Sequence, residues 1–318
     1  MSGGRVKAKK SLGQNWLRDE GTLGYIADCA ELTGEDFVLE IGAGLGTLTR
    51  VLMGRAGRVL AVEYDRELAG RLASEFPVEL STMKMTTAKW GSSPTSFFRR
   101  DLISPELTSG SPAKSNHEIA PKKACREFAE LCVVWADFLQ FNLDELPQSY
   151  KVVGNIPYYI TSKILRKLLT ARNRPQLIVL LVQREVAERL AAGAGDYSVL
   201  GISAQVYAEV TLGAVVRAEM FEPAPKVDSQ VVIMKPYGQI FGGTSPKVFS
   251  ERDFEKKFFR VVKAGFSARR KKLRTALAGG LNISVADAEK LLHAAGIDPN
   301  LRAQDLTIDD WRNLSGAI

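Results

Sequence analysis

Phe37-Val-Leu-Glu-Ile-Gly-Ala-Gly-Leu-Gly46 runs from a short apolar stretch into a glycine-rich turn. The apolar residues are typical of a strand buried on both faces. Glycines at the end of such a strand let the backbone come close to a ligand, although packing alone explains many such turns equally well. The G-x-G-x-G spacing differs from the dinucleotide fingerprint G-x-G-x-x-G and lacks the Gly-Lys-Ser/Thr ending of a phosphate loop. The turn therefore favours a ligand other than a pyrophosphate.

Similar apolar runs follow along the chain, with helical patterns between and after them. The predicted strands cover residues 37–41, 58–63, 131–135, 150–154 and 175–183, and the predicted helices cover 66–76, 161–171 and 184–192. This alternation predicts an α/β fold built on a parallel sheet. Residues 199–210 and 227–234 are predicted as later strands, so we expect the sheet to end in antiparallel members.

Two stretches interrupt the alternation and suggest the domain organisation. Residues 78–130 are rich in Ser, Thr and Pro without sustained periodicity, which predicts a long surface insertion. Residues 237–250 have the Gly, Pro and Ser content of a linker. Helices are expected over 252–277 and 285–295, and a last one is expected from Thr307, where Asp310 stands at capping-box spacing. We expect one larger domain over 1–240 that carries the insertion, and a small all-helical domain over 241–318.

Composition indicates a globular protein whose positive charge is concentrated. The chain has 318 residues, 45% of them hydrophobic, and a formal net charge of +7. Residues 1–18 carry five basic residues and no acidic one, and residues 251–275 carry ten basic residues against three acidic ones. Clustering of this kind favours contact with a polyanion at those two places.

Cysteine and histidine usage argues against a disulfide framework or a metal site. Cys29, Cys125 and Cys132 share no metal-like or redox spacing, and His117 and His293 lie far apart. We therefore expect no metal. No run approaches the ~18 apolar residues of a membrane span, and the basic N-terminus lacks the apolar core of a secretory signal. A cytoplasmic protein without membrane contact is expected, and residues 1–11 neither support nor exclude organelle targeting.

Polar side chains follow three further predicted strands. Glu63 ends the second strand, 21 residues after Gly42, where it can accept hydrogen bonds from ribose hydroxyls. Asp137 follows the third strand, and Asn155-Ile-Pro-Tyr158 follows the fourth. Ligands of open α/β sheets bind at the carboxyl ends of the strands. Together these residues predict one binding site at that edge.

The tetrad Asn155 to Tyr158 suits a flat exocyclic amine. An adenine amino group is a poor nucleophile, so a site that alkylates it must hold the NH2 with acceptors; the Asn155 side-chain oxygen and the Ile156 carbonyl are candidates. Pro157 fixes its own φ and keeps the turn stiff, and Tyr158 offers a ring for stacking on the base. In isolation, an ordinary strand-to-helix turn with Asn155 as a cap explains the same residues.

Several motifs together carry a resemblance to a known family. They are Lys10-Ser-Leu-Gly-Gln-Asn-Trp-Leu17, Glu40-Ile-Gly-Ala-Gly44, Glu63, Asp137, Gly154-Asn-Ile-Pro-Tyr158, Phe221-Glu-Pro-Ala-Pro-Lys-Val-Asp-Ser229 and Gly265-Phe-Ser-Ala-Arg-Arg-Lys-Lys-Leu-Arg274. The set resembles the KsgA-type ribosomal RNA adenine dimethyltransferases over nearly the whole chain outside the insertion. Ala43 and Trp16 depart mildly from the Pro and Phe that are usual in this family.

The resemblance implies a Rossmann-like methyltransferase with a small all-helical C-terminal domain. It also implies S-adenosylmethionine as cofactor and, as substrate, two adjacent adenosines near the 3′ end of small-subunit ribosomal RNA within a pre-ribosomal particle; we expect a monomer. Asn155, Pro157 and Tyr158 would form the catalytic turn. The implied cofactor contacts are Asn15, Leu17, Gly42, Glu63 at the ribose, Asp137 at the adenine amine, and Asn155. The match of Asp137 is the least secure, because the insertion more than doubles the family's usual interval after Glu63.

Two features remain open to more than one interpretation. The basic run Arg269, Arg270, Lys271, Lys272 and Arg274 is predicted to bind RNA phosphates, with a solvated helix face as the alternative. Phe221 is either a second stacking surface for the base or a core aromatic residue at the sheet edge.

Two other functions compete with the dimethyltransferase. One is a ribosome-assembly or RNA-binding factor with weak or no methylation, against which the intact tetrad Asn155 to Tyr158 argues. The other is an adenine methyltransferase of large-subunit RNA, as in related antibiotic-resistance enzymes. The segment from Phe221 to Ser229 favours the small subunit over this alternative.

Overall fold

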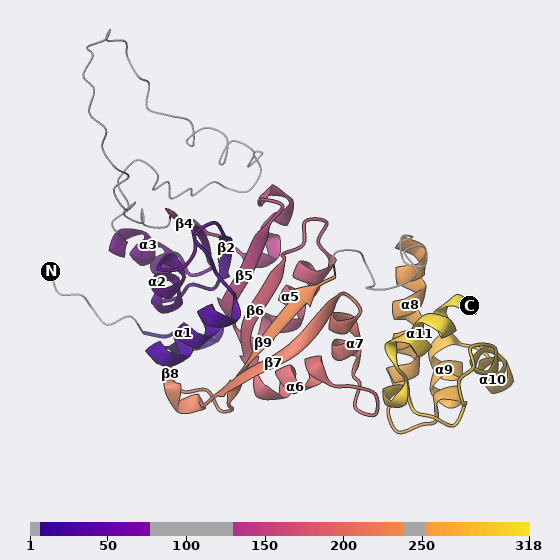
Figure 1. Ribbon diagram of the computed structural model, residues 1–318. Helices are drawn as coiled ribbons and strands as arrows, with labels where there is room; N and C mark the ends of the chain where they lie inside the picture. Colours follow the sequence, from indigo (N-terminus) through magenta and orange to yellow (C-terminus); the bar gives the residue numbers. More distant parts are fainter. Residues whose placement is uncertain (1–6, 77–129, 238–251) are drawn as a thin grey trace, which may run out of the picture.

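The computed structural model describes residues 7–76, 130–237 and 252–318 (Figure 1). The predicted insertion, residues 78–130, and the predicted linker, residues 237–250, lie outside the described residues except for one residue each. The sequence-based boundary at residue 240 therefore stays a prediction.

A seven-stranded mixed sheet forms the centre of the larger region. Its strand order is β4-β3-β2-β5-β6-β9-β7. In that order the strands are β4 (Glu130–Trp135), β3 (Arg58–Glu63), β2 (Phe37–Ile41), β5 (Tyr150–Asn155), β6 (Leu177–Gln183), β9 (Ser229–Pro236) and β7 (Ala208–Val216). The first five are mutually parallel, and β9 is antiparallel to both of its neighbours. The predicted α/β sheet with antiparallel final members is confirmed.

Helices cover both faces of the sheet. Alternate residues of each strand point to opposite faces; Val38 and Val59 thus join one buried cluster while Leu39 and Leu60 join another. The first cluster packs under α1 (Glu20–Cys29), α2 (Thr47–Met53) and α3 (Arg66–Glu75). The second packs under α5 (Thr161–Thr170), α6 (Arg184–Ala191) and α7 (Val199–Gln205). Each fully buried Val or Leu contributes roughly 1.5–3 kcal/mol, so both layers hold the strand ends firmly.

The strand order changes direction between β2 and β5, and this places a ligand site. The chain passes from β2 to β3 and β4 on one side, then returns to β5 and β6 on the other. A crevice at the carboxyl ends of the strands follows from such a reversal. Gly154 allows β5 to approach β2 there, because a Cβ at this position would lie 2.8 Å from the Ile41 carbonyl oxygen.

The N-terminal segment lies against a distant part of the chain. After a short 3-10 helix η1 (Lys10–Leu12), strand β1 (Trp16–Leu17) pairs antiparallel with β8 (Phe221–Glu222). Phe221 is 5% exposed and packs in the same cluster as Leu17. The core interpretation of Phe221 is therefore the one that the structure supports.

The C-terminal region is all-helical, as predicted, and lies beside α7 and the β7 edge (Figure 1). It contains α8 (Arg252–Gly265), η6 (Phe266–Ala268), α9 (Leu273–Leu281), α10 (Val285–Ala294), η7 (Ala303–Asp305) and α11 (Ile308–Gly316). The predicted capping box forms at α11, where Thr307 and Asp310 bond reciprocally. Contacts with the larger region include Gly195 N to Gln304 O at 2.9 Å and a ring pair, Tyr207 and Phe259, with centroids 6.2 Å apart.

One predicted strand is wrong. Residues 199–210 form α7 and only the start of β7, because Ser198 caps the helix by accepting a hydrogen bond from Gly201 N. Gly201 also packs too closely against α6 for any side chain: a Cβ there would lie 2.5 Å from the Arg189 carbonyl oxygen. A short apolar run has no periodicity that separates a buried helix from a strand. The other late strand was predicted two residues early, since β9 begins at Ser229.

The single helix predicted over residues 252–277 is also wrong. α8 ends at Gly265, and α9 starts at Leu273 after η6 and a turn closed by Lys271 N to Ala268 O. Gly265 faces the fully buried Trp311 ring, whose Cη2 would lie 2.3 Å from a Cβ at that position. Arg269 to Lys272 therefore lie in a turn between two helices and not on a helix face.

Candidate active site

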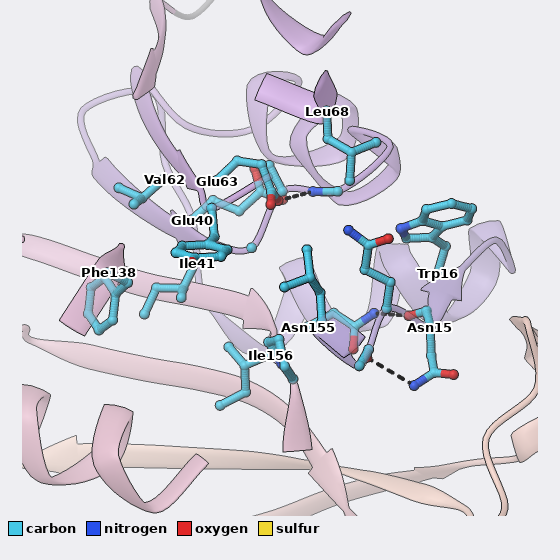
Figure 2. Close-up of a pocket in the computed structure, with 18 of the residues that line it drawn as sticks. Asn15, Trp16, Glu40, Ile41, Val62, Glu63, Leu68, Phe138, Asn155 and Ile156 are labelled. Carbon is cyan, nitrogen blue, oxygen red and sulfur yellow. Dashed lines mark hydrogen bonds between the residues drawn. The ribbon is translucent and has the colours of Figure 1, made fainter. Parts of the chain in front are cut away.

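A cavity of about 300 Å³ opens at the carboxyl ends of β2, β3 and β5 (Figure 2). The N-terminal segment from Leu12 to Leu17 forms one of its walls. The turn after β5 and the segment after β4 form others. The predicted strand-end residues are thus brought together with a segment that comes from far earlier in the chain.

The glycine turn after β2 depends on left-handed backbone. Gly42, Gly44 and Gly46 have φ of 75°, 57° and 74°, a region where a side chain is strained. Gly44 N donates to Glu63 Oε2 at 2.8 Å, which ties the turn to the end of β3. The backbone of Gly42 and Gly44 therefore forms part of the cavity wall.

Glu63 is held rigidly at the end of β3. Its second oxygen, Oε1, accepts from Asp65 N at 2.8 Å, and only 6% of the residue is exposed. Burial raises the pKa of this carboxyl, and the hydrogen bonds from Asp65 N and Gly44 N oppose the shift. Each carboxylate oxygen can accept a further hydrogen bond from a ligand.

Asp65 fastens the N-terminal segment across the cavity. Its Oδ2 accepts from Gln14 Nε2 at 3.0 Å, and its Oδ1 accepts from Lys9 Nζ at 2.9 Å. Burial alone would raise the pKa of Asp65, but these hydrogen bonds outweigh it and lower the pKa. The residues around Asn15 are thereby linked to the same strand end that carries Glu63.

Asn155 is oriented by the N-terminal segment. Its Nδ2 donates to the Asn15 carbonyl oxygen at 3.0 Å, and Asn15 Nδ2 donates to the Gly13 carbonyl oxygen at 3.2 Å (Figure 2). A carbonyl accepts and cannot donate, so the NH2 of Asn155 must face Asn15. The side-chain oxygen of Asn155 is left as an acceptor at the cavity.

Pro157 and Tyr158 continue the turn as a stiff connection to α5. Pro157, at φ −60°, caps the 3-10 helix η4 (Tyr158–Ile160) that precedes α5. The Tyr158 hydroxyl bonds Ser229 Oγ at 2.7 Å, and burial raises the pKa of the phenol. The Tyr158 ring is thus anchored to β9 while it lines the cavity.

Asp137 lies at the cavity two residues beyond β4. Its Oδ1 accepts from Leu139 N at 2.8 Å and caps the 3-10 helix η2 (Phe138–Gln140). From α5, Lys167 Nζ donates to the Leu139 carbonyl oxygen at 2.9 Å and sits 5.6 Å from the centre of the Phe138 ring. The segment that carries Asp137 is therefore held in place from outside the cavity.

All eight residues predicted for the catalytic turn and the cofactor contacts line this cavity. They are Asn15, Leu17, Gly42, Glu63, Asp137, Asn155, Pro157 and Tyr158. The five basic residues predicted to bind RNA are not among its lining residues. Of those five, Arg274 pairs with Glu289 at 2.7 Å, whereas Arg269, Arg270, Lys271 and Lys272 are exposed.

Several residues that line the cavity had no role predicted from the sequence. Glu40 is 1% exposed, and neither carboxylate oxygen has a hydrogen-bond partner among the described residues. Burial, with the charge of Glu63, raises the pKa of Glu40 to about 8; the nearby Thr49 hydroxyl opposes that shift without reaching normal hydrogen-bond geometry. Trp16 Nε1 is likewise buried without a partner in this part of the chain. The one available signal was an acidic residue inside an otherwise apolar strand.

A protein-family model described as ribosomal RNA adenine dimethylase matches residues 5–89 and 121–318. The chain belongs to this family. Residues 90–120, which the family model leaves unmatched, lie within the segment where the sequence predicts an insertion. The dimethylase family thus accounts for the rest of the chain from residue 5 to its last residue.

Relatives within the dimethylase family match nearly the whole chain. "Ribosomal RNA small subunit methyltransferase A" of Dehalococcoides mccartyi (strain CBDB1) is 36% identical over 315 residues, which cover 99% of this chain and 89% of that protein. The protein of the same name from Desulfitobacterium hafniense (strain DSM 10664 / DCB-2) is 35% identical over 322 residues, covering 99% and 94%.

Solved structures share the fold of this dimethylase family member. A dimethyladenosine transferase from Plasmodium falciparum aligns with a TM-score of 0.64 and 21% identity over 94% of this chain and 95% of that one. The 23S rRNA methyltransferase ErmE aligns with a TM-score of 0.62 and 23% identity over 95% and 99%. None of the helices in the described residues combines the length and apolar character that crossing a membrane requires.

Proposed function

We propose that this protein transfers methyl groups to the exocyclic amines of two adjacent adenosines near the 3′ end of small-subunit ribosomal RNA. The observation that carries the proposal is the orientation of Asn155, whose NH2 is held by the Asn15 carbonyl and whose oxygen remains an acceptor at the cavity. Membership of the dimethylase family and the names of the relatives support adenine and the small subunit.

The acceptor turn acts by position and charge. The Asn155 oxygen and the Ile156 carbonyl accept from the target amine, and these contacts strengthen as the nitrogen gains positive charge in the transition state. Pro157 keeps the turn stiff, at a φ of −60°, and the anchored Tyr158 supplies a ring for the base. The target adenosine must leave its stack to reach this turn. A general base is not required, since water can take the proton after transfer.

The cavity fits S-adenosylmethionine, which when bound supplies an electrophilic methyl group. Its ribose suits Glu63, whose oxygens are fixed by Gly44 N and Asp65 N and retain acceptor capacity. Its adenine amine suits Asp137. The buried carboxyl of Glu40, which has no hydrogen-bond partner among the described residues, offers polar atoms to such a ligand. Asn15, Leu17 and Gly42 complete the contacts that we assign to this cofactor.

For the RNA we assign a phosphate-binding role to the turn between α8 and α9. Arg269, Arg270, Lys271 and Lys272 are exposed and adjacent there, and contacts of this kind position RNA without reading its sequence. We further propose that the protein acts as a cytoplasmic monomer on a pre-ribosomal particle.

The two alternatives give different products. An assembly factor without activity would bind small subunits and transfer no methyl group. An enzyme of large-subunit RNA is disfavoured by the names of the relatives, since the resemblance to ErmE, at 23% identity, concerns the fold alone.

The decisive experiment measures methyl transfer from labelled S-adenosylmethionine to small ribosomal subunits that lack the modification. Mass spectrometry of the RNA then locates the product. We expect two adjacent dimethyladenosines from the wild type and a loss of at least about 100-fold in kcat for Asn155→Ala, in line with removal of one preorganised hydrogen-bonding group. Asn142→Ala, which changes an exposed cap that does not line the cavity, serves as the control. If Asn155→Ala incorporates as much labelled methyl as the wild type, the proposed role of Asn155 is wrong.

A further inference from the structure

Helix α5 runs away from the candidate active site, and all of its charged residues are basic. α5 starts directly after η4, and Tyr159 within η4 lines the cavity. Residues 158–174 contain five basic residues and no acidic one; the basic residues are Lys163, Arg166, Lys167, Arg172 and Arg174.

Three residues of this segment form one stripe. Lys163 and Arg166 have the spacing i, i+3 within α5, which places their side chains on the same side of that helix. Tyr159 precedes them in η4 and forms the end of the stripe at the cavity. All three are exposed, Tyr159 by 62%. The stripe therefore begins with an aromatic ring at the mouth of the cavity and continues along α5 as positive charge.

The cations of the stripe are not used for ion pairs. Within the described part of the chain, no carboxylate lies within 4.0 Å of Lys163 or Arg166. On the neighbouring α6, by contrast, Arg184 pairs with Glu188 at 2.8 Å. Exposed cations that are left unpaired in a row are available to a polyanion.

The Tyr159 ring is placed as a platform. Its Cδ1 and Cε1 atoms lie against Gly13 of the N-terminal segment, where a Cβ would meet both at 3.3 Å. One part of the ring is thus supported while most of the side chain is open to solvent. Aromatic rings of this kind stack on unpaired bases.

The far end of the stripe leads toward the C-terminal helices. The charge of Arg166 acts on Tyr207, partly offsetting the rise in the pKa of that phenol caused by burial and by Glu255. The Tyr207 hydroxyl bonds Glu255 of α8. Exposed basic residues follow on α8, beginning with Lys256 and Lys257. Tyr207 thus relates the Arg166 end of the stripe to α8, which belongs to the second basic region.

We propose that Tyr159, Lys163 and Arg166 hold the unpaired RNA strand next to the target adenosine. Tyr159 stacks on a neighbouring base, and the two cations contact phosphates of the nucleotides that follow. An unpaired strand fits and a duplex does not, because stacking needs a free base face. This assignment rests on the proposed function, since it extends the path of the same RNA substrate.

Two double variants with the same loss of charge test the phosphate contacts. Lys163→Gln/Arg166→Gln removes the stripe cations. Arg55→Gln/Arg58→Gln removes two cations at the opposite end of β3: the half-buried Arg55, which pairs with Asp28, and the exposed Arg58, which pairs with Glu130 at 3.3 Å. Affinity for unmodified small subunits is measured over a salt series. The stripe variant should lower the slope of log K against log salt by about 1.4, at roughly 0.7 for each lost contact with a single strand.

Two variants of Tyr159 test the stacking. Tyr159→Ala should raise KM for the RNA on the order of 10-fold, as expected when a stacked base loses its platform. Tyr159→Phe should leave KM for the RNA close to its wild-type value, because the ring remains. Calorimetry with S-adenosylhomocysteine should give the same affinity for the wild type and the Lys163→Gln/Arg166→Gln variant.

The outcomes separate this inference from the proposed function. Equal salt slopes for the two double variants, or an unchanged KM for Tyr159→Ala, would overturn the inference while methyl transfer by the wild type upheld the function. A wild-type protein that transfers no methyl group to this RNA would overturn the proposed function itself.

Discussion

At the scale of single residues, Glu40 shows how the candidate site differs from an ordinary sheet end. Its carboxyl group is buried in the strand that leads into the glycine turn, and no hydrogen bond satisfies it among the described residues. An unpaired buried carboxyl favours its neutral form, and this raises its pKa to about 8. A position of this kind destabilises the fold at alkaline pH, where the carboxyl must ionise without a partner.

Glu40→Gln should remove a pH dependence from stability. The ordinary pKa of the unfolded side chain is 4.5 and the folded value is about 8, so the stability due to neutral Glu40 is complete below pH 4.5. It is lost as pH rises toward 8, by up to about 1.4 kcal/mol per pH unit. Urea unfolding without cofactor should show Glu40→Gln gaining on the wild type between pH 5 and pH 8. A constant difference across that range would contradict the burial of an unpaired carboxyl.

At the scale of elements, the N-terminal segment completes a site that the sheet alone leaves open. Its backbone carbonyl at Asn15 orients Asn155, and Gln14 and Lys9 are held by Asp65 beyond the end of β3. The acceptor turn and the ribose-binding strand are therefore joined through one short segment. Neither half of the site is independent of it.

Asp65→Asn should loosen this segment and weaken cofactor binding. The substitution removes the charge that Lys9 pairs with and lowers the acceptor strength toward Gln14. Because solvent screens the exposed Lys9 ammonium, we expect KM for S-adenosylmethionine to rise only about fivefold. kcat at saturating cofactor should change much less, because Asn155 keeps its place once the ligand is bound. Glu67→Gln, which alters the more distant partner of Lys9 at 3.5 Å, is the comparison, and equal effects of the two substitutions would count against the role of Asp65.

The packing of α7 against α6 rests on a glycine. A Cβ at Gly201 would lie 2.5 Å from the Arg189 carbonyl oxygen, so the two elements meet only because that atom is absent. Gly201→Ala should lower the free energy of unfolding by roughly 1–3 kcal/mol, the usual cost of overpacking. Gly193→Ala, where no atom lies within 4 Å, controls for the change in the unfolded chain. Denaturant midpoints of the two variants decide the matter, and equal values would show that α7 adjusts without cost.

At the scale of the whole molecule, two basic surfaces lie at different distances from the cavity. The stripe on α5 begins at its mouth, whereas Arg269 to Lys272 occupy the turn between α8 and α9 in the C-terminal region. The two regions are joined by contacts such as that of Gly195 with Gln304. A structured RNA can therefore be held by both surfaces while one adenosine enters the cavity.

Replacing Arg269, Arg270, Lys271 and Lys272 by Gln should weaken RNA binding without affecting the cofactor. Each lost phosphate contact lowers the salt slope by about 0.7–0.9, so losing all four should lower it by up to roughly 3.6. Filter binding of small subunits over a salt series measures this, and calorimetry with S-adenosylhomocysteine checks the cavity. An unchanged slope would favour the alternative interpretation, in which these residues form a solvated surface.

The parallel strands, the helices between them and the polar residues at the strand ends could all be predicted from the sequence. Runs such as 37–41 and 58–63 are apolar enough to predict buried strands, and both strands have these bounds in the structure. Glu63, Asp137 and Asn155 were predicted because carboxyl ends of parallel strands share one edge, and all three line the cavity. Local chemistry suffices where the signal lies within a few neighbouring residues.

Features that depend on contacts between residues far apart in the chain were visible only in the folded structure. α7 lies against α6 at Gly201, where a side chain would not fit, and α8 ends at Gly265, which packs against Trp311. Asn155 faces its acceptor because the N-terminal segment, 140 residues earlier, supplies a carbonyl. In each case the physical reason is the same: the deciding contact joins residues that the sequence keeps far apart.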